Sequence, residues 1–254
     1  MSPTLLFLSG LIFLGAYCAY RLTTGGAKPS PSQWVTGIVL LGGLILDNLA
    51  TGMATKGLLI CLLPLLSFWV LMFFGRNHLP SGGDWIAMIA IGLSLCLSYS
   101  IYHQAIGAYE SGDEFFYHQS EGNIASFEWI AFTNPDTGER TPWKLGFWID
   151  SLTAIMLMVV AGISFLVHLF SLGYMKGEEN YSRYFGYLGI FSFSMLLLVL
   201  TDNLFVLYIC WELVGVSSFL LIGFFINKDS AAAAAKKAFL TNRVGDLGFA
   251  IGLF

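Results

Sequence analysis

A single glutamate lies in the middle of a long apolar run, where a charged side chain is unfavourable unless it is paired or solvated. Glu212 falls ten residues after Asp202 and sixteen before Lys228, so in a helix it lies roughly 15 Å from the first boundary. A charge at that depth costs about 2.5–3.5 kcal/mol on insertion scales, so the side chain must face protein or water. A carboxyl group held between desolvation and a nearby cation can change its protonation state, as a proton relay requires. The alternative is a protonated glutamate that serves only as an interhelical hydrogen bond.

The next apolar segment contains charged residues at helical spacings. Arg243 and Asp246 are three residues apart and can pair on one face of a helix. Lys237 lies on the same segment, which follows that of Glu212 after a short loop, so the two can pair although their depths differ. For Arg243 the alternative is a purely structural interhelical contact. For Lys236 it is a side chain that extends to the membrane interface.

Four other residues are weaker candidates for proton chemistry. His168 lies in an apolar segment near one interface and could relay protons near neutral pH, although a packing histidine is the ordinary case. Asp150 and Asp202 begin and end apolar runs, where an acid is common. Asp47 is expected to lie in a short turn rather than within the membrane.

The elements that must position these residues are membrane helices. The 254 residues are 56% hydrophobic and 11% charged, with a mean hydropathy of +0.73, whereas an average soluble domain has roughly 25% charged residues. A membrane helix needs about 20 mainly apolar residues. The predicted fold class is therefore an all-α polytopic membrane protein of about eight spans. The segments are 4–20, 34–53, 57–75, 85–103, 149–172, 184–200, 204–226 and 232–254.

The distribution of loop charges predicts one orientation. Eight spans place every loop rich in lysine and arginine on one side and the long 104–148 segment on the other. That segment has seven acidic residues against Arg140 and Lys144. By the positive-inside rule the acidic loop and both termini are periplasmic, in a bacterial inner membrane. The basic residues on the inner side are Arg21, Lys28, Arg76, Lys176, Arg183, Lys228, Lys236 and Lys237.

Two classes of function are excluded by residue patterns. The four cysteines, Cys18, Cys61, Cys96 and Cys210, each stand alone in an apolar run without a CxxC pair or a Cys/His spacing, so no metal site is expected. Basic residues are not clustered with aromatics, so nucleic acid is not an expected partner. Membrane lipid is an expected partner.

Three blocks of sequence resemble one known family. LGFWIDSLTAIMLMVVAGISFLVHLFSLGYM (145–175), TDNLFVLYICWELVGVSSFLLIGFF (201–225) and AAKKAFLTNRVGDLGFAIGLF (234–254) closely resemble the largest antiporter-like subunit of respiratory NADH:quinone oxidoreductase, complex I. That subunit is related to the large subunits of multi-component Na⁺/H⁺ antiporters. The resemblance is weaker over 57–103.

The resemblance implies roles for individual residues. Glu212 resembles the essential glutamate of the family's fifth conserved helix, which takes part in a proton channel. Arg243 and Asp246 match the polar pair of the sixth, and Lys237 lies in the same block. His168, Asp202 and Lys236 are weaker members of the proposed pathway.

The resemblance also implies a domain organisation. Residues 1–56 add two spans before the family's usual start, and 57–254 form the N-terminal part of the antiporter-like domain, an incomplete inverted-repeat bundle. The family's subunit continues through a broken seventh helix, a second inverted repeat and a lateral helix. We therefore expect half of a proton channel and a second chain that supplies the C-terminal half.

The predicted function is part of the proton-translocating membrane arm of complex I, coupled to NADH oxidation and quinone reduction. The chain would be a subunit of a translocase without redox chemistry or cofactors of its own. NADH, FMN, iron–sulfur clusters and quinone would be bound by other subunits, and other membrane-arm subunits would be its partners. The alternatives are a large-subunit fragment of a Na⁺/H⁺ antiporter, a related bicarbonate-uptake or hydrogenase complex, or a scaffold that does not transport.

Overall fold

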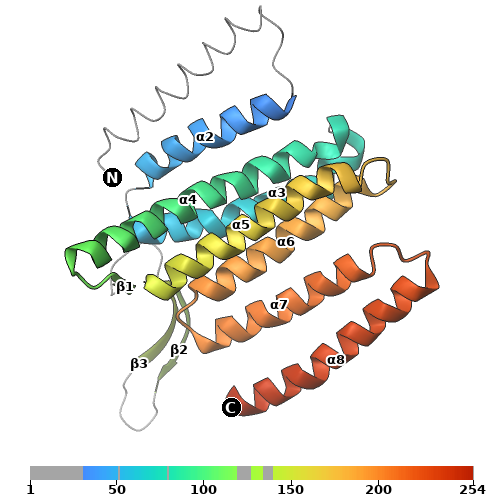
Figure 1. Ribbon diagram of the computed structural model, residues 1–254. Helices are drawn as coiled ribbons and strands as arrows, with labels where there is room; N and C mark the ends of the chain where they lie inside the picture. Colours follow the sequence, from blue (N-terminus) through green and yellow to red (C-terminus); the bar gives the residue numbers. More distant parts are fainter. Residues whose placement is uncertain (1–30, 51, 79, 119–126, 134–139, 254) are drawn as a thin grey trace, which may run out of the picture.

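The structure is a bundle of long, antiparallel helices with a few short strands at one end (Figure 1). The computed structural model describes residues 31–50, 52–78, 80–118, 127–133 and 140–253. The predicted first span, 4–20, lies outside them. The helices are α2 (Pro31–Leu49), α3 (Met53–His78), η1 (Pro80–Gly83), α4 (Asp84–Ser111), α5 (Ser151–Tyr174), α6 (Tyr181–Leu200), α7 (Leu204–Ile222) and α8 (Asp229–Leu253).

Five of the described helices are long and apolar enough to cross a membrane, namely α3 to α7. They match five of the eight predicted spans, and the chain is a multi-pass α-helical membrane protein. α2 contains a shorter apolar stretch, Gly37–Leu49. α8 has 25 residues but is not among the five, because it includes five charged residues.

Two predicted boundaries were wrong. The helix predicted for 85–103 continues to Ser111, so the connection to the next membrane helix begins eight residues later than expected. Asp47 lies inside α2, which ends at Leu49, rather than in a turn. In both cases the cause is the same: a helix continues past its apolar stretch when its polar residues find partners or solvent at the membrane boundary.

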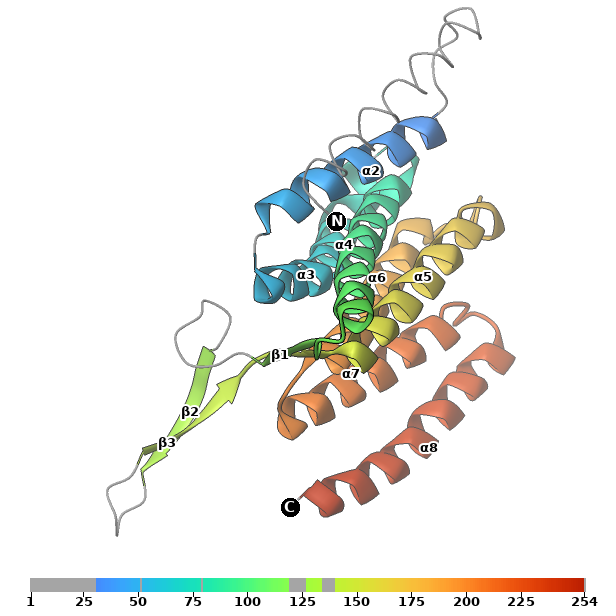
Figure 2. The same cartoon turned by 60° about the vertical axis from the view of Figure 1, so that its left-hand side comes forward.

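The long connection between α4 and α5 contains two small antiparallel sheets. β1 (Phe116–His118) pairs with β4 (Trp148–Asp150), and β2 (Phe127–Thr133) pairs with β3 (Arg140–Leu145), with a bulge between Glu128 and Ile130. Figure 2 shows the β2–β3 hairpin extending away from the helices. The predicted outer loop is therefore partly ordered as strands.

The core lies among α3, α4, α5 and α6. Its fully buried side chains include Ile60, Leu97, Leu157 and Leu196, one from each helix. α7 and α8 pack at the edge of this core (Figure 1) and bury few residues. Four apolar side chains of α8 are more than 60% exposed: Leu240, Val244, Leu247 and Ile251.

A proline inside α3 shows how the bundle satisfies its backbone in an apolar setting. Pro64 has no N–H, so the carbonyl of Ile60 loses its usual helical donor. Ser94 of α4 donates a hydrogen bond from its hydroxyl to that carbonyl over 3.0 Å. Because an unpaired carbonyl in hydrocarbon costs several kcal/mol, this contact helps to fix α4 against α3.

Close approach of α6 to α3 depends on a glycine. A Cβ on Gly189 would lie 3.0 Å from the Pro64 carbonyl oxygen and 3.0 Å from the Ser67 hydroxyl. Small residues at such crossings let helix backbones approach, which is the usual basis of packing between membrane helices.

Candidate functional site

Glu212 lies near the middle of α7. It follows Leu204 by eight residues and precedes Ile222 by ten, which places it roughly 12 and 15 Å from the two ends of the helix. The Tyr208 hydroxyl, one turn earlier, donates a hydrogen bond to Glu212 Oε1 over 2.7 Å. The carboxylate is therefore held at mid-depth by its own helix before any other helix contributes.

Arg243 of α8 joins two acidic residues. Its guanidinium forms an ion pair with Glu212 and a second, with Nη1 3.4 Å from Oδ2, with Asp246 one turn later. The guanidinium also lies over the ring of Phe239, 4.6 Å from its centroid. Arg243 thus belongs to neither acid alone, and a change in the charge of one acid alters its attraction to the other.

Asp246 is held from the opposite helix. Its side chain is 6% exposed, and its Oδ1 accepts a 2.9 Å hydrogen bond from the indole nitrogen of Trp211 on α7. Trp211 is next to Glu212 in sequence, so α7 both contains one acid of the cluster and contacts the other. We name Tyr208, Trp211, Glu212, Arg243 and Asp246 the α7–α8 cluster.

The register of the two antiparallel helices explains why Arg243, and not Lys237, pairs with Glu212. Ring contacts join Tyr208 to Phe249 and Phe219 to Phe239, so the residue opposite Glu212 falls close to Asp246. Lys237 lies six residues, or roughly 9 Å, from Arg243 toward the α7–α8 turn. Lys237 is exposed and forms no ion pair within the described part of the chain.

The charges of the α7–α8 cluster do not balance. With both acids ionised, two carboxylates share one guanidinium, so the group has a formal charge of −1 within a largely apolar pair of helices. Adding one proton to Glu212 removes this imbalance and leaves Arg243 paired with Asp246. The side chains of Glu212 and Arg243 are 23% and 31% exposed, so the described helices do not fully enclose this ion pair.

The weaker candidates lie elsewhere in the bundle. His168 of α5 is 1% exposed, and its Nδ1 lies 2.7 Å from the Ser164 carbonyl oxygen, beside the ring of Phe185. Because a carbonyl oxygen can only accept, Nδ1 holds the hydrogen in this arrangement. His168 is therefore part of the α5–α6 packing, outside the α7–α8 cluster.

Asp202 and Lys236 also lie apart from the cluster. Asp202 Oδ1 accepts a 3.0 Å hydrogen bond from the Gly146 amide, which fastens the segment before α5 to the α6–α7 turn. Lys236 lines a cavity near the α7–α8 turn. Of the seven residues predicted for the pathway, the structure brings together three: Glu212, Arg243 and Asp246.

Sequence reasoning missed a second charged group, at the end of the bundle that holds the strands. Lys56 Nζ lies 2.5 Å from Asp47 Oδ1 and donates to the Ser100 hydroxyl over 2.9 Å. These residues come from α2, α3 and α4, and we name them the α2–α4 cluster. The sequence did contain a signal for this ion pair. Asp47 and Lys56 have opposite charges and lie close to the α2–α3 turn, one on each side of it.

Two partners of the main cluster were also missed. Tyr208 precedes Glu212 by four residues, a spacing that indicates contact on a helix. Trp211 gives no such signal, because its partner is on another helix. Among the described residues no group of three or more His, Cys, Asp or Glu side chains could hold a metal ion.

Comparison with known proteins shows which family this chain belongs to. Residues 138–185 match the family described as NADH-ubiquinone oxidoreductase (complex I), chain 5 N-terminus. Residues 201–254, which contain the whole α7–α8 cluster, match NADH:quinone oxidoreductase/Mrp antiporter, TM. This chain belongs to the family of antiporter-like membrane subunits of NADH:quinone oxidoreductases.

Individual members of this antiporter-like family align over most of the chain. An F(420)H(2) dehydrogenase subunit L from Methanosarcina mazei is 40% identical over 203 residues, which are 80% of this chain and 27% of that protein. An NADH-quinone oxidoreductase subunit L from Neisseria meningitidis serogroup A is 36% identical over 201 residues, 78% of this chain and 27% of that protein. A subunit L from Rhodobacter capsulatus is 50% identical over 138 residues, 52% of this chain and 18% of that protein.

The chain spans about a quarter of the length of the first two of these relatives.

Proposed function

We propose that this chain is part of the proton-translocating membrane arm of an NADH:quinone oxidoreductase, and that the α7–α8 cluster is one proton-transfer station. The observation that supports this is the mid-depth Glu212 bound to a cation that a second acid shares. Other subunits would bind NADH, FMN, iron–sulfur clusters and quinone. This chain would contribute transport and no electron transfer.

The geometry supports a simple exchange. When Glu212 takes up a proton, its attraction for Arg243 falls and the guanidinium is free to turn toward Asp246, which is 3.4 Å away. When the proton leaves, the Glu212 ion pair forms again. Tyr208 and Trp211 keep the two carboxylates in place during the change. Arg243 therefore acts as a movable countercharge, and Glu212 is the proposed proton carrier.

The energy for translocation must come from elsewhere in the complex. Moving one charge against the membrane potential costs about 2.3 kcal/mol per 100 mV. Redox chemistry on other subunits would supply it. We therefore propose as partners the other membrane-arm subunits and the remaining length of the antiporter-like subunit, on whichever polypeptide it lies.

A second candidate function is ion transport in a related complex. The family matched by 201–254 includes Mrp antiporters, and one relative is named for F(420)H(2) rather than NADH. The cluster chemistry would be the same in each case. Purification of the assembled complex and assay with NADH, with F420H2 and with a sodium gradient would separate these alternatives.

We also propose an orientation in a bacterial inner membrane. The α3–α4, α5–α6 and α7–α8 turns lie at one end of the bundle, and the strands and the α6–α7 turn at the other (Figure 1). The first end has Lys176 and Lys228 in its turns, so the positive-inside rule makes it cytoplasmic. Leu253 of α8 then lies at the periplasmic end. We place the N-terminus on the periplasmic side as well, and we propose 1–56 as an addition to the family domain of 57–254.

Cysteine labelling tests this orientation. A cysteine in place of Ser111, which is exposed at the end of α4, should react with a membrane-impermeant maleimide from the periplasm, and one in place of Glu178 should not. Both positions are exposed, so a difference reports sidedness. Ser182 would be a poor choice because it is 6% exposed and donates to the Gly82 carbonyl. The reverse labelling pattern would overturn the orientation.

The proposed function itself is tested by Glu212→Gln in the assembled complex. Gln is nearly isosteric and still accepts the Tyr208 hydrogen bond, so assembly should persist while proton pumping falls by an order of magnitude or more, about the scale of lost acid–base function. Pumping is measured in proteoliposomes as potential generated per NADH oxidised. Glu178→Gln, the same change in an exposed turn, is the matched control. Normal pumping by an assembled Glu212→Gln complex would contradict the proposal.

A further inference from the structure

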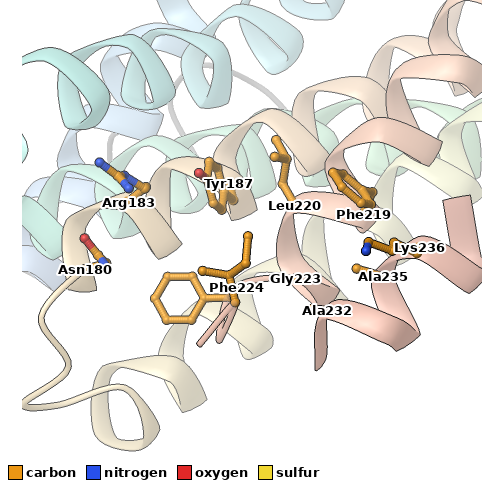
Figure 3. Close-up of a pocket in the computed structure, with 11 residues that line it drawn as sticks. Asn180, Arg183, Tyr187, Phe219, Leu220, Gly223, Phe224, Ala232, Ala235 and Lys236 are labelled. Carbon is orange, nitrogen blue, oxygen red and sulfur yellow. The ribbon is translucent and has the colours of Figure 1, made fainter. Parts of the chain in front are cut away.

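A cavity lies where α6, α7 and α8 meet, close to the α7–α8 turn. Its volume is about 250 Å³, slightly below the roughly 300–1,000 Å³ of typical small-molecule sites. Figure 3 shows Arg183 and Lys236 on opposite sides of it. The remaining lining is mainly apolar, with Phe219, Leu220 and Phe224 from α7 and the turn that follows it.

The two cations of the cavity have no acidic partner. Arg183 and Lys236 form no ion pair with any residue that the structure describes, unlike Arg243 and Lys56. Both side chains are exposed, and Asn180 and Tyr187 add polar groups to the same lining. An anion in the cavity would gain attraction from both cations without first displacing a carboxylate.

The depth of the cavity matches a lipid headgroup. Arg183 is the third residue of α6 and Lys236 the eighth of α8, so they lie roughly 3 and 10 Å from the ends of their helices. This end of the bundle is the one that the positive-inside rule assigns to the cytoplasmic leaflet. Basic pockets between membrane helices at this level bind anionic headgroups.

We propose that this cavity binds one anionic phospholipid, with its headgroup in the cavity that Arg183 and Lys236 line; its assignment to the cytoplasmic leaflet rests on the orientation proposed above. The glycerol and first methylenes would lie against Phe219, Leu220 and Phe224, which form an apolar part of the lining. A hydrated inorganic anion would gain nothing from these apolar side chains. The lipid would join the edge pair α7–α8 to α6. This site is separate from the α7–α8 cluster and does not depend on the transported ion.

The test uses the assembled complex and a phosphatidylglycerol with a photoreactive group in its acyl chain. Mass spectrometry measures its crosslinking to the peptide that contains 219–226, and phosphatidylcholine with the same chain serves as the neutral-headgroup probe. At subsaturating lipid, Arg183→Gln/Lys236→Gln should reduce phosphatidylglycerol crosslinking roughly thirtyfold, and each single change roughly fivefold. Lys176→Gln/Lys228→Gln, which removes two cations of the same end outside the cavity, should leave it unchanged.

A second variant leaves both cations intact. Ala232→Phe fills the cavity from α8, so it should abolish crosslinking at 219–226 while the complex still assembles. Unchanged crosslinking in this variant would overturn the proposal. So would equal crosslinking by phosphatidylcholine, equal loss in the control pair, or displacement of the lipid by millimolar inorganic phosphate, which would indicate a site for a soluble anion.

Discussion

The two charged clusters of this protein contain similar residues but differ in charge balance and in exposure. In the α2–α4 cluster one acid, Asp47, faces one base, Lys56, and the side chains are 13% and 9% exposed. In the α7–α8 cluster two acids share Arg243, and the side chains of Glu212 and Arg243 are 23% and 31% exposed. The first cluster is balanced and closed, whereas the second is unbalanced and open.

This difference agrees with the proposal that the α7–α8 cluster, and not the α2–α4 cluster, changes its charge during function. In a closed pair each ion depends on the other, and any change in protonation leaves a buried, uncompensated charge. In the α7–α8 cluster one proton can be added and a cation still has a partner. We infer that the α2–α4 cluster fastens α2 to α3 and α4. Gly43 of α2 also allows close packing against α4, because a Cβ at this position would lie 2.7 Å from Cβ of Cys96.

The largest effect on stability is expected from breaking the closed pair. Lys56→Met leaves the largely buried Asp47 without its cation and should destabilise the protein by about 3–5 kcal/mol. Asp47→Leu/Lys56→Met removes both charges and should recover most of that loss. Unfolding in detergent measures both, with the exposed Lys176→Met as control. If the single variant were as stable as the control, the closed pair would not fasten α2.

A second prediction separates Arg243 from Lys237, the residue that the sequence offered as a partner of Glu212. Arg243→Gln should reduce proton pumping about tenfold or more, because it removes the shared countercharge of Glu212 and Asp246. Lys237→Gln should have a much smaller effect, since Lys237 has no acidic partner among the described residues. The measurement is pumping per NADH oxidised. Equal loss in the two variants would show that the register of α7 and α8 does not select the partner.

Trp211→Phe tests how Asp246 is held. The change removes the indole N–H that donates to Asp246 but keeps an aromatic ring against Phe249, whose centroid lies 6.1 Å away. Loss of a hydrogen bond to a charged group should cost about 1.5–3 kcal/mol of stability. Phe249→Leu, which removes the ring contact and leaves the hydrogen bond, should cost less. The opposite order would show that packing, rather than the hydrogen bond, holds α8 in register.

The smallest effect concerns an acid outside both clusters. Asp150 caps α5, and its Oδ1 accepts a 2.7 Å hydrogen bond from the Thr153 amide. Partial burial raises the pKa of this carboxyl, but hydrogen bonds from Thr153 and Trp148 outweigh that effect and hold the pKa below its ordinary value near 3.8. Asp150→Ala should cost about 1 kcal/mol, and Asp150→Asn less, because Asn also caps helices.

The pH dependence of this cap has a definite sign. The pKa of Asp150 is lower in the folded state than in the unfolded one, so the stabilisation that depends on its charge is present above pH of about 4 and is lost as the pH falls through the lowered pKa. The difference in unfolding free energy between Asp150→Ala and wild type should therefore be larger at pH 7 than in acid, where the protonated carboxyl remains only as a neutral cap. A difference that did not shrink in acid would contradict the assignment.

Much of this protein followed from its sequence. The apolar runs predicted α5, α6 and α7 at 149–172, 184–200 and 204–226, close to the observed helices, because runs of that length can be satisfied only in lipid or among other helices. Glu212 was identified for the same reason, since a carboxylate in such a run requires a partner. The three quoted sequence blocks identified the family.

What the tertiary structure decided is which side chains meet. The sequence suggested that Lys237 could pair with Glu212, but the axial register of α7 and α8 places Arg243 there instead. It also placed Asp47 within α2, opposite Lys56, where a turn had been expected. The physical reason is that each residue advances a helix by 1.5 Å and turns it by about 100°. A shift of one residue between neighbouring helices therefore changes every cross-helix partner, while the apolar pattern that predicts each helix stays the same.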